Sequence, residues 1–406
     1  MRGLATLVAA VVLTGIQLQA GADWPQFRGP GGQGVSDEQN LPVQWGETEG
    51  VVWKVPVAGL GWSSPVVAGG RVWLTTSSGN RDASLRLLAF DAATGRQVLD
   101  TEVFKIPQAQ LLNAKNSLAS PTPIVDGDRV YVHFGSEGTA AISTSGAVLW
   151  KTRLDYETQH GNGGSPVLYR DLLIVNCDGF DQAYVVALET KTGKPRWKTS
   201  RRRPWSQAYS TPIIVRSADR DLLVSVGAFR TGAYDPLTGA DVWQVSYGDG
   251  FSNVPRPVAG HGMIYLATGF QQPSLMAVRM GGTGDVTKTH VAWTLSRGAP
   301  LTPSPVLAGD ELYLVTDTGV ASCVDARTGR LHWQQRLNGN FSASPVAADG
   351  RIYFQSEEGE TTVVAAGPSF RRLAVNALDG AMLASLAVSG GAMFIRTDTH
   401  LYRISR

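Results

Sequence analysis

Amide, hydroxyl and aromatic side chains stand just before the copies of a recurring Ser-Pro-Val motif, such as Ser64-Pro65-Val66. These groups form hydrogen bonds and Arg256 adds a cation, so together they suit a polar or anionic ligand, a sugar or a peptide segment. The alternative is that they satisfy one another and buried water. The candidates for a ligand site are Trp62, Asn116, His160, Asn162, Gln207, Tyr209, Asn253, Arg256, Asn340 and Phe341.

The same stretches contain no carboxylate, which argues against metal or redox chemistry there. A hard cation such as Ca²⁺ is held poorly without Asp or Glu, and a general base would have to be His160. The glycines that surround His160 and Asn162 favour a plain turn, although the loop could also present His160 as a base or ligand. We therefore predict no catalytic residue, no metal site and no cofactor.

The two cysteines, Cys177 and Cys323, are expected to be buried free thiols. Asp178 follows Cys177, but no histidine or cation is near in sequence to lower the pKa of the thiol, so it is a poor nucleophile. The repeats place the two cysteines in different structural units, which argues against a disulfide.

The elements that must position these side chains follow from the spacing of the motif. Successive copies are 58, 43, 46, 45, 48, 40 and 42 residues apart, the length of a four-stranded propeller blade. The sequence therefore predicts an all-β, eight-bladed β-propeller over residues 51–406, with the residues before each copy meeting at the mouth of a central channel. The copies are Ser64-Pro65-Val66, Thr122-Pro123-Ile124, Ser165-Pro166-Val167, Thr211-Pro212-Ile213, Arg256-Pro257-Val258, Ser304-Pro305-Val306, Ser344-Pro345-Val346 and a degenerate Leu386-Ala387-Val388.

Most intervals contain a complete, partial or stretched copy of an Asp-x-x-Thr-Gly turn followed by a strand with a tryptophan, and one of the best copies runs from Asp325 to Trp333. Asp and Thr can bond the turn backbone, and Gly supplies the positive φ that the turn needs. The tryptophan can cover the gap between two blades while its N–H finds a carbonyl. We predict this structural docking role for Trp53, Trp150, Trp197, Trp243, Trp293 and Trp333.

The last repeat provides only three strands, over residues 383–388, 392–397 and 400–404. Residues 51–55, Val-Val-Trp-Lys-Val, have the pattern of a fourth strand without a blade before it. We expect this N-terminal strand to complete the last blade and close the ring, which leaves no open sheet edge.

The amino terminus has the pattern of a secretory signal peptide. Arg2 precedes the apolar run from Leu4 to Ile16, and small residues lead to Ala22, so we expect cleavage after Ala22; an uncleaved anchor is the alternative. No cysteine lies near that point, so we do not expect a lipid anchor. We expect a periplasmic or secreted protein without an integral membrane span. Residues 23–50 are predicted to form an arm that packs on the side or bottom of the propeller or plugs the channel.

The composition limits the class of protein. With 46 Gly, 21 Pro and 11 Trp, 43% hydrophobic and 17% charged residues, the chain has a large core and many turns and is not disordered. A net charge of +2 is too small to argue for nucleic acid. The one basic run, Arg201-Arg202-Arg203, is interpreted as a solvated loop.

The Asp-x-x-Thr-Gly-x-x-x-Trp copies beside the Pro-Val strands resemble the docking repeats of the pyrroloquinoline-quinone (PQQ) dehydrogenase-like propeller superfamily. The opening Asp23-Trp24-Pro25-Gln26-Phe27-Arg28 and the stretch Trp62-Ser63-Ser64-Pro65-Val66 look like exported PQQ-like repeat proteins of planctomycetes. The superfamily also contains BamB, an eight-bladed scaffold lipoprotein of outer-membrane assembly and not an enzyme. The resemblance therefore implies the fold and leaves the function open.

We expect a noncatalytic, monomeric propeller that binds a protein, peptide or glycan partner in the cell envelope. The first alternative is a PQQ-dependent oxidoreductase whose Ca²⁺ and quinone occupy an atypical site. The second is a hydrolase or lyase that uses His160 or a loop acid.

Overall fold

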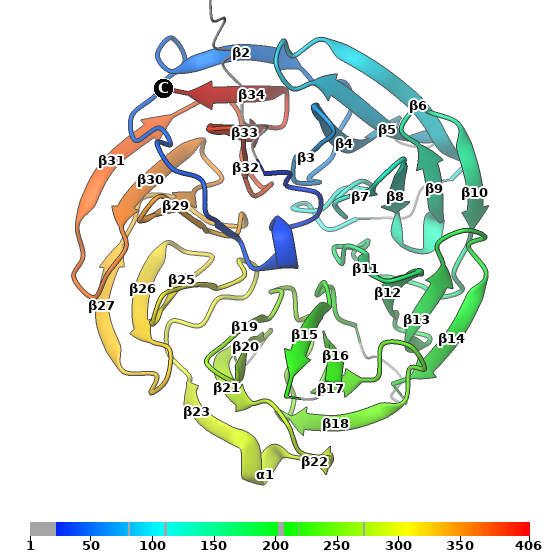
Figure 1. Ribbon diagram of the computed structural model, residues 1–406, viewed down its shortest axis with the longest axis vertical. Helices are drawn as coiled ribbons and strands as arrows, with labels where there is room; N and C mark the ends of the chain where they lie inside the picture. Colours follow the sequence, from blue (N-terminus) through cyan, green and yellow to red (C-terminus); the bar gives the residue numbers. More distant parts are fainter. Residues whose placement is uncertain (1–21, 80–81, 109–111, 202–206, 219, 271–272) are drawn as a thin grey trace, which may run out of the picture.

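Eight β-sheets are arranged around a central axis in the computed structural model of the chain (Figure 1). The structure describes residues 22–79, 82–108, 112–201, 207–218, 220–270 and 273–406. The predicted signal peptide lies almost entirely on residues 1–21, outside the described part of the chain. None of the described helices is long and apolar enough to cross a membrane.

Each sheet is one blade, numbered here in chain order. Blades one to four contain β3 (Val66–Ala68), β4 (Arg71–Ser78), β5 (Ala83–Asp91) and β6 (Gln97–Ile106); β7 (Ile124–Asp126), β8 (Arg129–His133), β9 (Thr139–Ser143) and β10 (Val148–Thr152); β11 (Val167–Tyr169), β12 (Leu172–Asp178), β13 (Ala183–Glu189) and β14 (Pro195–Ser200); and β15 (Ile213–Ser217), β16 (Arg220–Val226), β17 (Arg230–Tyr234), β18 (Asp241–Ser246) and β22 (Gly284–Asp285).

Blades five to eight follow in the same order. They contain β19 (Val258–Gly260), β20 (Met263–Thr268), β21 (Ser274–Arg279) and β23 (Val291–Leu295); β24 (Val306–Ala308), β25 (Glu311–Val315), β26 (Val320–Asp325) and β27 (Leu331–Arg336); β28 (Val346–Ala348), β29 (Arg351–Gln355), β30 (Glu360–Ala365) and β31 (Arg372–Ala377), joined by β1 (Val35–Ser36); and β32 (Ala387–Ser389), β33 (Ala392–Arg396), β34 (His400–Ser405) and β2 (Val51–Pro56). Short helical turns are η1 (Pro30–Gly32), η2 (Gly135–Glu137) and α1 (Thr287–His290).

The predicted eight-bladed propeller is confirmed, and seven innermost strands begin at the residue after the motif proline. The eighth copy needs a shift of one residue. Because β32 begins at Ala387, Leu386 takes the place of the proline and Ser385 that of the preceding serine. The Leu386 N–H, which a proline lacks, donates to Gln355 Oε1 at 2.9 Å.

The predicted closure of the ring is also confirmed. Strand β2 pairs antiparallel with β34, from Val51 opposite Ile404 to Pro56 opposite His400. Both ends of the propeller therefore lie in one blade, and unfolding of either end opens the ring.

Five of the six predicted docking tryptophans donate their indole N–H to a carbonyl in the third-to-fourth-strand turn of the next blade. Trp150 bonds the Thr190 carbonyl at 2.8 Å and Trp197 bonds the Pro236 carbonyl at 3.1 Å. The indole also covers the turn glycine, so that a Cβ on Gly239 would lie 2.5 Å from Trp197 Cε3. The other donors are Trp53 to Ala92, Trp293 to Ala326 and Trp333 to Gly367.

Trp243 differs because the next blade has no Asp-x-x-Thr-Gly turn. Strand β22 and helix α1 occupy that stretch, β22 adds a parallel strand beside β18, and the buried Trp243 Nε1 has no partner among the described residues. Two blade junctions have no tryptophan. At the junction of blades one and two, Leu99 lies against Gly146. At the junction of blades seven and eight, blade eight has no turn between a third and a fourth strand, because its fourth strand, β2, comes from the N-terminus.

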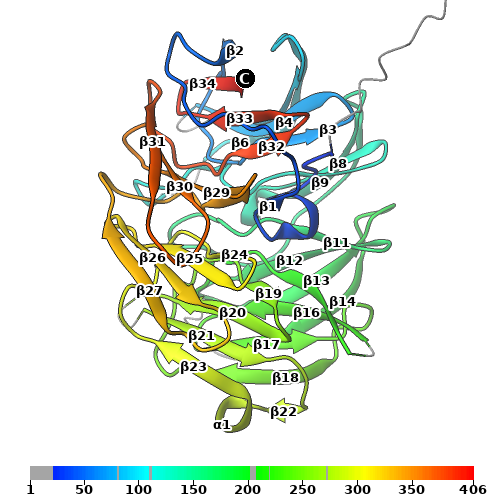
Figure 2. The same cartoon turned by 60° about the vertical axis from the view of Figure 1, so that its left-hand side comes forward.

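The arm of residues 22–50 crosses the end of the channel opposite the mouth (Figure 1). Trp24 forms an antiparallel bridge with Val67, and β1 pairs in parallel with β28. Arg28 donates to the carbonyls of Pro305 (2.7 Å) and Pro345 (3.3 Å). In the turned view, η1 and β1 lie in the middle of the ring (Figure 2). The arm thus closes one end of the channel.

Candidate functional site at the channel mouth

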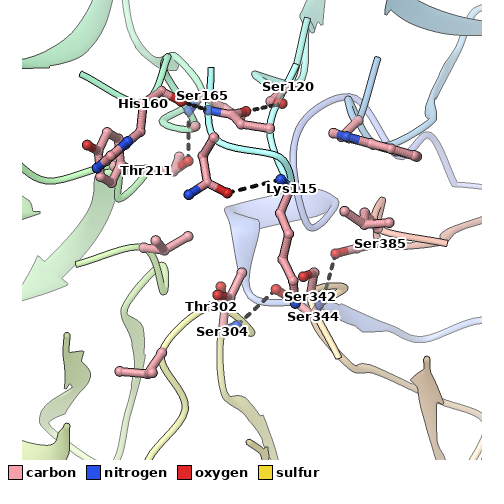
Figure 3. A pocket seen from close by; sticks show the side chains of 18 of the residues that line it. Lys115, Ser120, His160, Ser165, Thr211, Thr302, Ser304, Ser342, Ser344 and Ser385 are labelled. Atoms are coloured by element: carbon pink, nitrogen blue, oxygen red, sulfur yellow. Dashed lines mark hydrogen bonds between the residues drawn. The ribbon is translucent and has the colours of Figure 1, made fainter. Parts of the chain in front are cut away.

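A cavity of about 470 Å³ opens at the mouth of the channel (Figure 3). Its wall comes from the segments that precede the innermost strands, together with loops that join second and third strands, and Phe27 of the arm also lines it. In an antiparallel four-stranded blade these two kinds of connection lie at the same edge, so the repeat places them together. The cavity lies within the size range of small-ligand sites.

Serine and threonine hydroxyls encircle the deeper part of this cavity. In most blades, the residue before the motif proline donates its backbone N–H to the hydroxyl at the same position in the next blade. We call this set the hydroxyl ring. Its bonds are Ser64 N to Thr122 (2.9 Å), Thr122 N to Ser165 (2.9 Å), Ser165 N to Thr211 (2.8 Å), Arg256 N to Ser304 (2.9 Å), Ser304 N to Ser344 (2.9 Å) and Ser344 N to Ser385 (2.9 Å).

The ring is interrupted at blade five, where Arg256 replaces the hydroxyl residue. Its side chain is buried, and Nη1 donates to the Phe27 carbonyl of the arm at 2.6 Å. A Cβ on Gly32 would lie 2.1 Å from Arg256 Nη1, so the arm can approach the guanidinium only with glycine there. Arg256 therefore fixes the arm and does not extend into the mouth.

Four of the ten predicted ligand residues line the cavity: Trp62, Asn116, His160 and Tyr209. Asn116 is held in place because its amide donates to the His160 carbonyl at 2.7 Å and its oxygen accepts from Ser120 Oγ at 2.5 Å. Tyr209 donates to Gln207 Oε1 at 2.7 Å, and burial together with the charge of Asp178 raises the pKa of Tyr209 to about 12. Tyr209 is therefore a neutral donor and acceptor at neutral pH.

The other predicted residues serve the scaffold rather than the cavity wall. Asn253 is fully buried and donates to the Gly227 carbonyl at 2.6 Å, and Phe341 is in the core between blades six and seven. Asn340 bonds Glu358 Oε1 at 2.9 Å. The remaining three have similar local partners: Asn162 bonds the Gly164 carbonyl, Gln207 bonds Gln159 and Arg256 bonds Phe27.

The sequence prediction missed the charged groups of the mouth: it did not include Lys115, which directly precedes Asn116, and it did not consider the loops that carry the acidic groups. Lys115 forms an ion pair with Glu357 at 2.7 Å, and Ser342 also donates to that carboxylate at 2.6 Å. Asp317 lines the cavity, and its Oδ2 accepts the backbone N–H groups of Leu301 (2.8 Å) and Thr302 (3.2 Å). Asp317 and Glu357 lie in second-to-third-strand loops, so propeller topology was the signal that could have found them.

An aromatic rim borders the cavity. Phe251 and Phe270 line it and pack edge to face, with ring centroids 5.7 Å apart, and Phe229 lies 6.4 Å from Phe251. Phe270 is 55% exposed, the largest exposed fraction among the large hydrophobic residues described. An aromatic side chain left in water beside a concave site is typical of a binding surface.

A second cavity, of about 430 Å³, lies beside Arg201 and Arg230 between blades three and four. Arg201 is buried and forms an ion pair with Asp178 at 2.7 Å, which corrects the interpretation of this arginine as part of a solvated loop; Arg202 and Arg203 lie outside the described residues. Burial outweighs the charge of Arg201 and raises the pKa of Asp178 to about 7.

Cys177 is buried, as is Cys323, and both are free thiols as expected.

The residues of the mouth do not match the ligand set of a Ca²⁺-bound quinone. Ca²⁺ takes six to eight oxygen ligands, with carboxylates prominent among them. Among the residues that line the cavity, Asp317 is the sole carboxylate, and one of its oxygens is already bonded to two backbone N–H groups. The described part of the chain contains no group of three or more His, Cys, Asp or Glu residues placed to hold a metal.

Comparison with known proteins identifies relatives of one kind by sequence. A family described as outer membrane protein assembly factor BamB matches residues 32–227 and 283–400. The protein of that name from Legionella pneumophila (strain Paris) is 26% identical over 205 residues, which is 47% of this chain. The match spans 49% of the length of that relative.

Solved structures share the fold at low identity. BamB from Moraxella catarrhalis has a TM-score of 0.64 and 14% identity, with 88% of this chain and 97% of that chain covered. A europium-containing methanol dehydrogenase has a TM-score of 0.68 and 11% identity, covering 93% and 90%. A quinohemoprotein alcohol dehydrogenase from Comamonas testosteroni has a TM-score of 0.70 and 10% identity, covering 94% and 80%. These likenesses establish the architecture only.

Proposed function

The chain belongs to the family described as outer membrane protein assembly factor BamB, and from that premise we propose that it is a noncatalytic propeller that binds a partner in the cell envelope through its channel mouth. The observation that carries the proposal is the mouth cavity, where an exposed aromatic rim surrounds a wall of amides and hydroxyls. Such a site offers apolar area for affinity and hydrogen bonds for orientation without a reactive pair of groups.

A polypeptide segment is the partner that this surface suits best, and a glycan is the second. Phe251, Phe270 and Trp62 can pack against apolar side chains, while Asn116 and Tyr209 can bond backbone amides. The proposed setting is the periplasm or the cell exterior. The basic and apolar start of the chain supports that setting.

Photo-crosslinking in the native cell tests the site. A benzophenone amino acid is placed at Phe270 or at Trp62 on the mouth, and at Val375 on outer strand β31 as the control, since Val375 is 47% exposed but far from the cavity lining. We expect both mouth positions to give the same adduct and Val375 to give none. Adducts from Val375 alone, or none from the mouth, would contradict a binding role for this face.

The alternative function is a PQQ-dependent oxidoreductase, and the fold shared with a methanol dehydrogenase and a quinohemoprotein alcohol dehydrogenase favours testing it. The cavity residues do not fit the metal and quinone, so we derive no reaction through them. Addition of PQQ with Ca²⁺ tests this alternative by quinone absorbance, thermal stability and dye reduction. We expect no spectral shift, no stabilisation and no turnover; a saturable shift with dye reduction would replace the binding proposal.

A further inference from the structure

The hydroxyl ring has unused hydrogen-bond donors that face the cavity. Thr122, Ser165, Thr211, Ser304, Ser344 and Ser385 each accept a backbone N–H, and their hydroxyls donate no hydrogen bond to any described residue. All six side chains are buried and line the cavity. Each oxygen accepts one N–H with one of its two lone pairs, and its O–H hydrogen remains to bond a ligand atom. The ring can therefore donate several hydrogen bonds to an acceptor in the cavity.

Three buried guanidinium groups contact residues of the ring or their neighbours in sequence. Arg256 is itself a ring position, and Arg28 donates to the carbonyls of Pro305 and Pro345, which follow Ser304 and Ser344. Arg396 donates to Ser63 Oγ at 2.7 Å and to the Ser63 carbonyl at 3.2 Å, next to Ser64. The three cations thus lie at different places around the ring: Arg256 at blade five, Arg28 at blades six and seven, and Arg396 at blade eight.

None of these three arginines forms an ion pair with a described carboxylate; their partners are carbonyls and one hydroxyl. Burial without a counterion lowers the pKa of each to about 9, and for Arg28 the charge of Arg256 adds to the effect. Each remains positively charged at neutral pH, and the Nε atoms of all three have no partner in the described structure. The three arginines therefore place buried positive charge beside the hydroxyl ring, and no carboxylate among the described residues pairs with it.

Lys115 adds an exposed cation to the wall of the same cavity. Its Nζ pairs with Glu357 at 2.7 Å, and its side chain is 54% exposed, so it can turn toward a ligand at small cost (Figure 3). The acidic groups of the mouth oppose this effect only in part, because Asp317 Oδ2 is held by two backbone N–H groups and Glu357 is paired.

We propose that the hydroxyl ring binds the carboxylate of a peptide segment that enters the mouth, an inference that rests on the proposed function and names the chemistry its partner must present. The carboxylate accepts O–H bonds from the ring, and the guanidinium groups supply the compensating charge. The rim phenylalanines hold the adjoining apolar side chain. A segment with an aromatic or aliphatic residue beside a terminal or side-chain carboxylate satisfies all three features.

Calorimetric titration of the mature chain with a matched pair of probes tests the proposal. N-acetylphenylalanine carries the carboxylate, and its amide differs only in lacking that charge. We expect the acid to bind at least about tenfold more tightly than the amide, as for hydrogen bonds to a charged acceptor. Equal affinity for acid and amide, or no binding of either at millimolar concentration, would overturn the proposal.

A second probe distinguishes the two sources of a carboxylate. Acetyl-phenylalanyl-glutamic acid with an amidated C-terminus carries only the side-chain carboxylate. Tighter binding of N-acetylphenylalanine assigns a chain terminus to the ring, and tighter binding of the glutamyl probe assigns an acidic side chain. Inorganic phosphate serves as the third arm; binding of phosphate without either peptide probe would overturn the assignment to a peptide carboxylate.

Variants locate the binding at the ring. Thr211→Val removes a hydroxyl and should weaken acid binding about tenfold, whereas Thr211→Ser keeps the hydroxyl and should keep the affinity. In case Thr211→Val does not fold, variants of the Lys115–Glu357 ion pair provide an independent test. Lys115→Met should weaken acid binding and Glu357→Gln should strengthen it, each about threefold, with the amide unchanged.

The outcomes separate this inference from the proposed function. Mouth crosslinks that persist in Thr211→Val, together with equal binding of acid and amide, would leave a binding mouth without a carboxylate site. Acid binding that depends on Thr211 without any mouth crosslink would establish the anion site and reject the envelope partner.

Discussion

At the scale of single residues, several groups have environments that set measurable behaviour, and the clearest is a histidine that does not line the cavity. His133 ends strand β8 and is buried, with Nδ1 2.8 Å from Thr139 Oγ1 and Nε2 3.3 Å from the Tyr156 hydroxyl. Burial without an acidic partner lowers its pKa from 6.5 to about 3. The native state therefore keeps this imidazole neutral.

This shift makes folding stability depend on pH. The unfolded chain takes up the proton near pH 6.5 and the folded chain does not, so stability is lost as the pH falls from 6.5 toward 3. We expect His133 to contribute about 1.4 kcal/mol of loss per pH unit in that window. Urea unfolding at several pH values should show a smaller slope of stability against pH for His133→Gln than for the wild type; equal slopes would contradict this account.

Turn glycines under the docking tryptophans are expected to tolerate no side chain. Gly239 has φ +71°, and a Cβ there would lie 2.5 Å from Trp197 Cε3, whereas Gly262 has φ +72° with nothing within 4 Å. Both substitutions to alanine incur backbone strain, but only Gly239→Ala also displaces an indole. We expect Gly239→Ala to lower the free energy of unfolding by about 1–3 kcal/mol more than Gly262→Ala. Thermal unfolding of the two variants measures the difference, and similar losses would show that the indole adjusts freely.

At the scale of elements, strand β2 joins the two ends of the chain in one sheet. Trp53 on this strand packs against Phe394, with ring centroids 6.0 Å apart, and bonds the Ala92 carbonyl of blade one at 3.2 Å. The strand therefore contacts both its own blade and the next, and its side chains stabilise the closure.

Truncation on the two faces of β2 should have unequal effects. We expect Trp53→Ala to lower the free energy of unfolding by about 3–5 kcal/mol, as for large aromatic residues in cores. Val52→Ala on the same strand should change it by less than about 0.5 kcal/mol, because Val52 is 50% exposed. Denaturant unfolding tests both; a small loss for Trp53→Ala would mean that β2 is not needed for closure.

At the scale of the whole molecule, the N-terminal arm links distant blades across the axis. Trp24 is buried against blade one, Arg28 reaches blades six and seven, and the Leu41 N–H bonds Asp349 of blade seven at 3.0 Å. Phe27 of the same arm lines the mouth cavity from the far side. The same arm therefore both connects distant blades of the ring and forms part of the cavity wall.

Loss of the Trp24 anchor should release the arm. We expect Trp24→Ala to cost about 3–5 kcal/mol of stability and to speed amide exchange at Gly34, whose N–H bonds the Arg28 carbonyl. The neighbouring exposed residue gives the control, Asp23→Ala, with little effect. Hydrogen exchange followed by mass spectrometry measures both. Unchanged protection of the arm in Trp24→Ala would show that its other contacts hold it without Trp24.

Much of the fold could be predicted from the sequence because its determinants are local and repeated. A proline fixes the start of seven of the eight innermost strands, and complete or partial copies of the Asp-x-x-Thr-Gly turn recur at blade length in most blades, so eight blades and the closing strand followed from spacing. The site was less accessible to this reasoning. Trp62, Asn116, His160 and Tyr209 line the cavity, whereas Asn253, Phe341 and Arg256, which occupy equivalent places in the pattern, are buried in the scaffold.

The sequence by itself determined the number of blades, the manner of ring closure and the type of side chain that faces the axis, since each depends on short segments with fixed spacing. Only the tertiary structure decided which of those side chains reach the cavity, that Lys115 pairs with Glu357 across it, and that the arm lies at the opposite end. The physical reason is that these relations join residues hundreds of positions apart. Packing and burial fix them, and no local pattern encodes them.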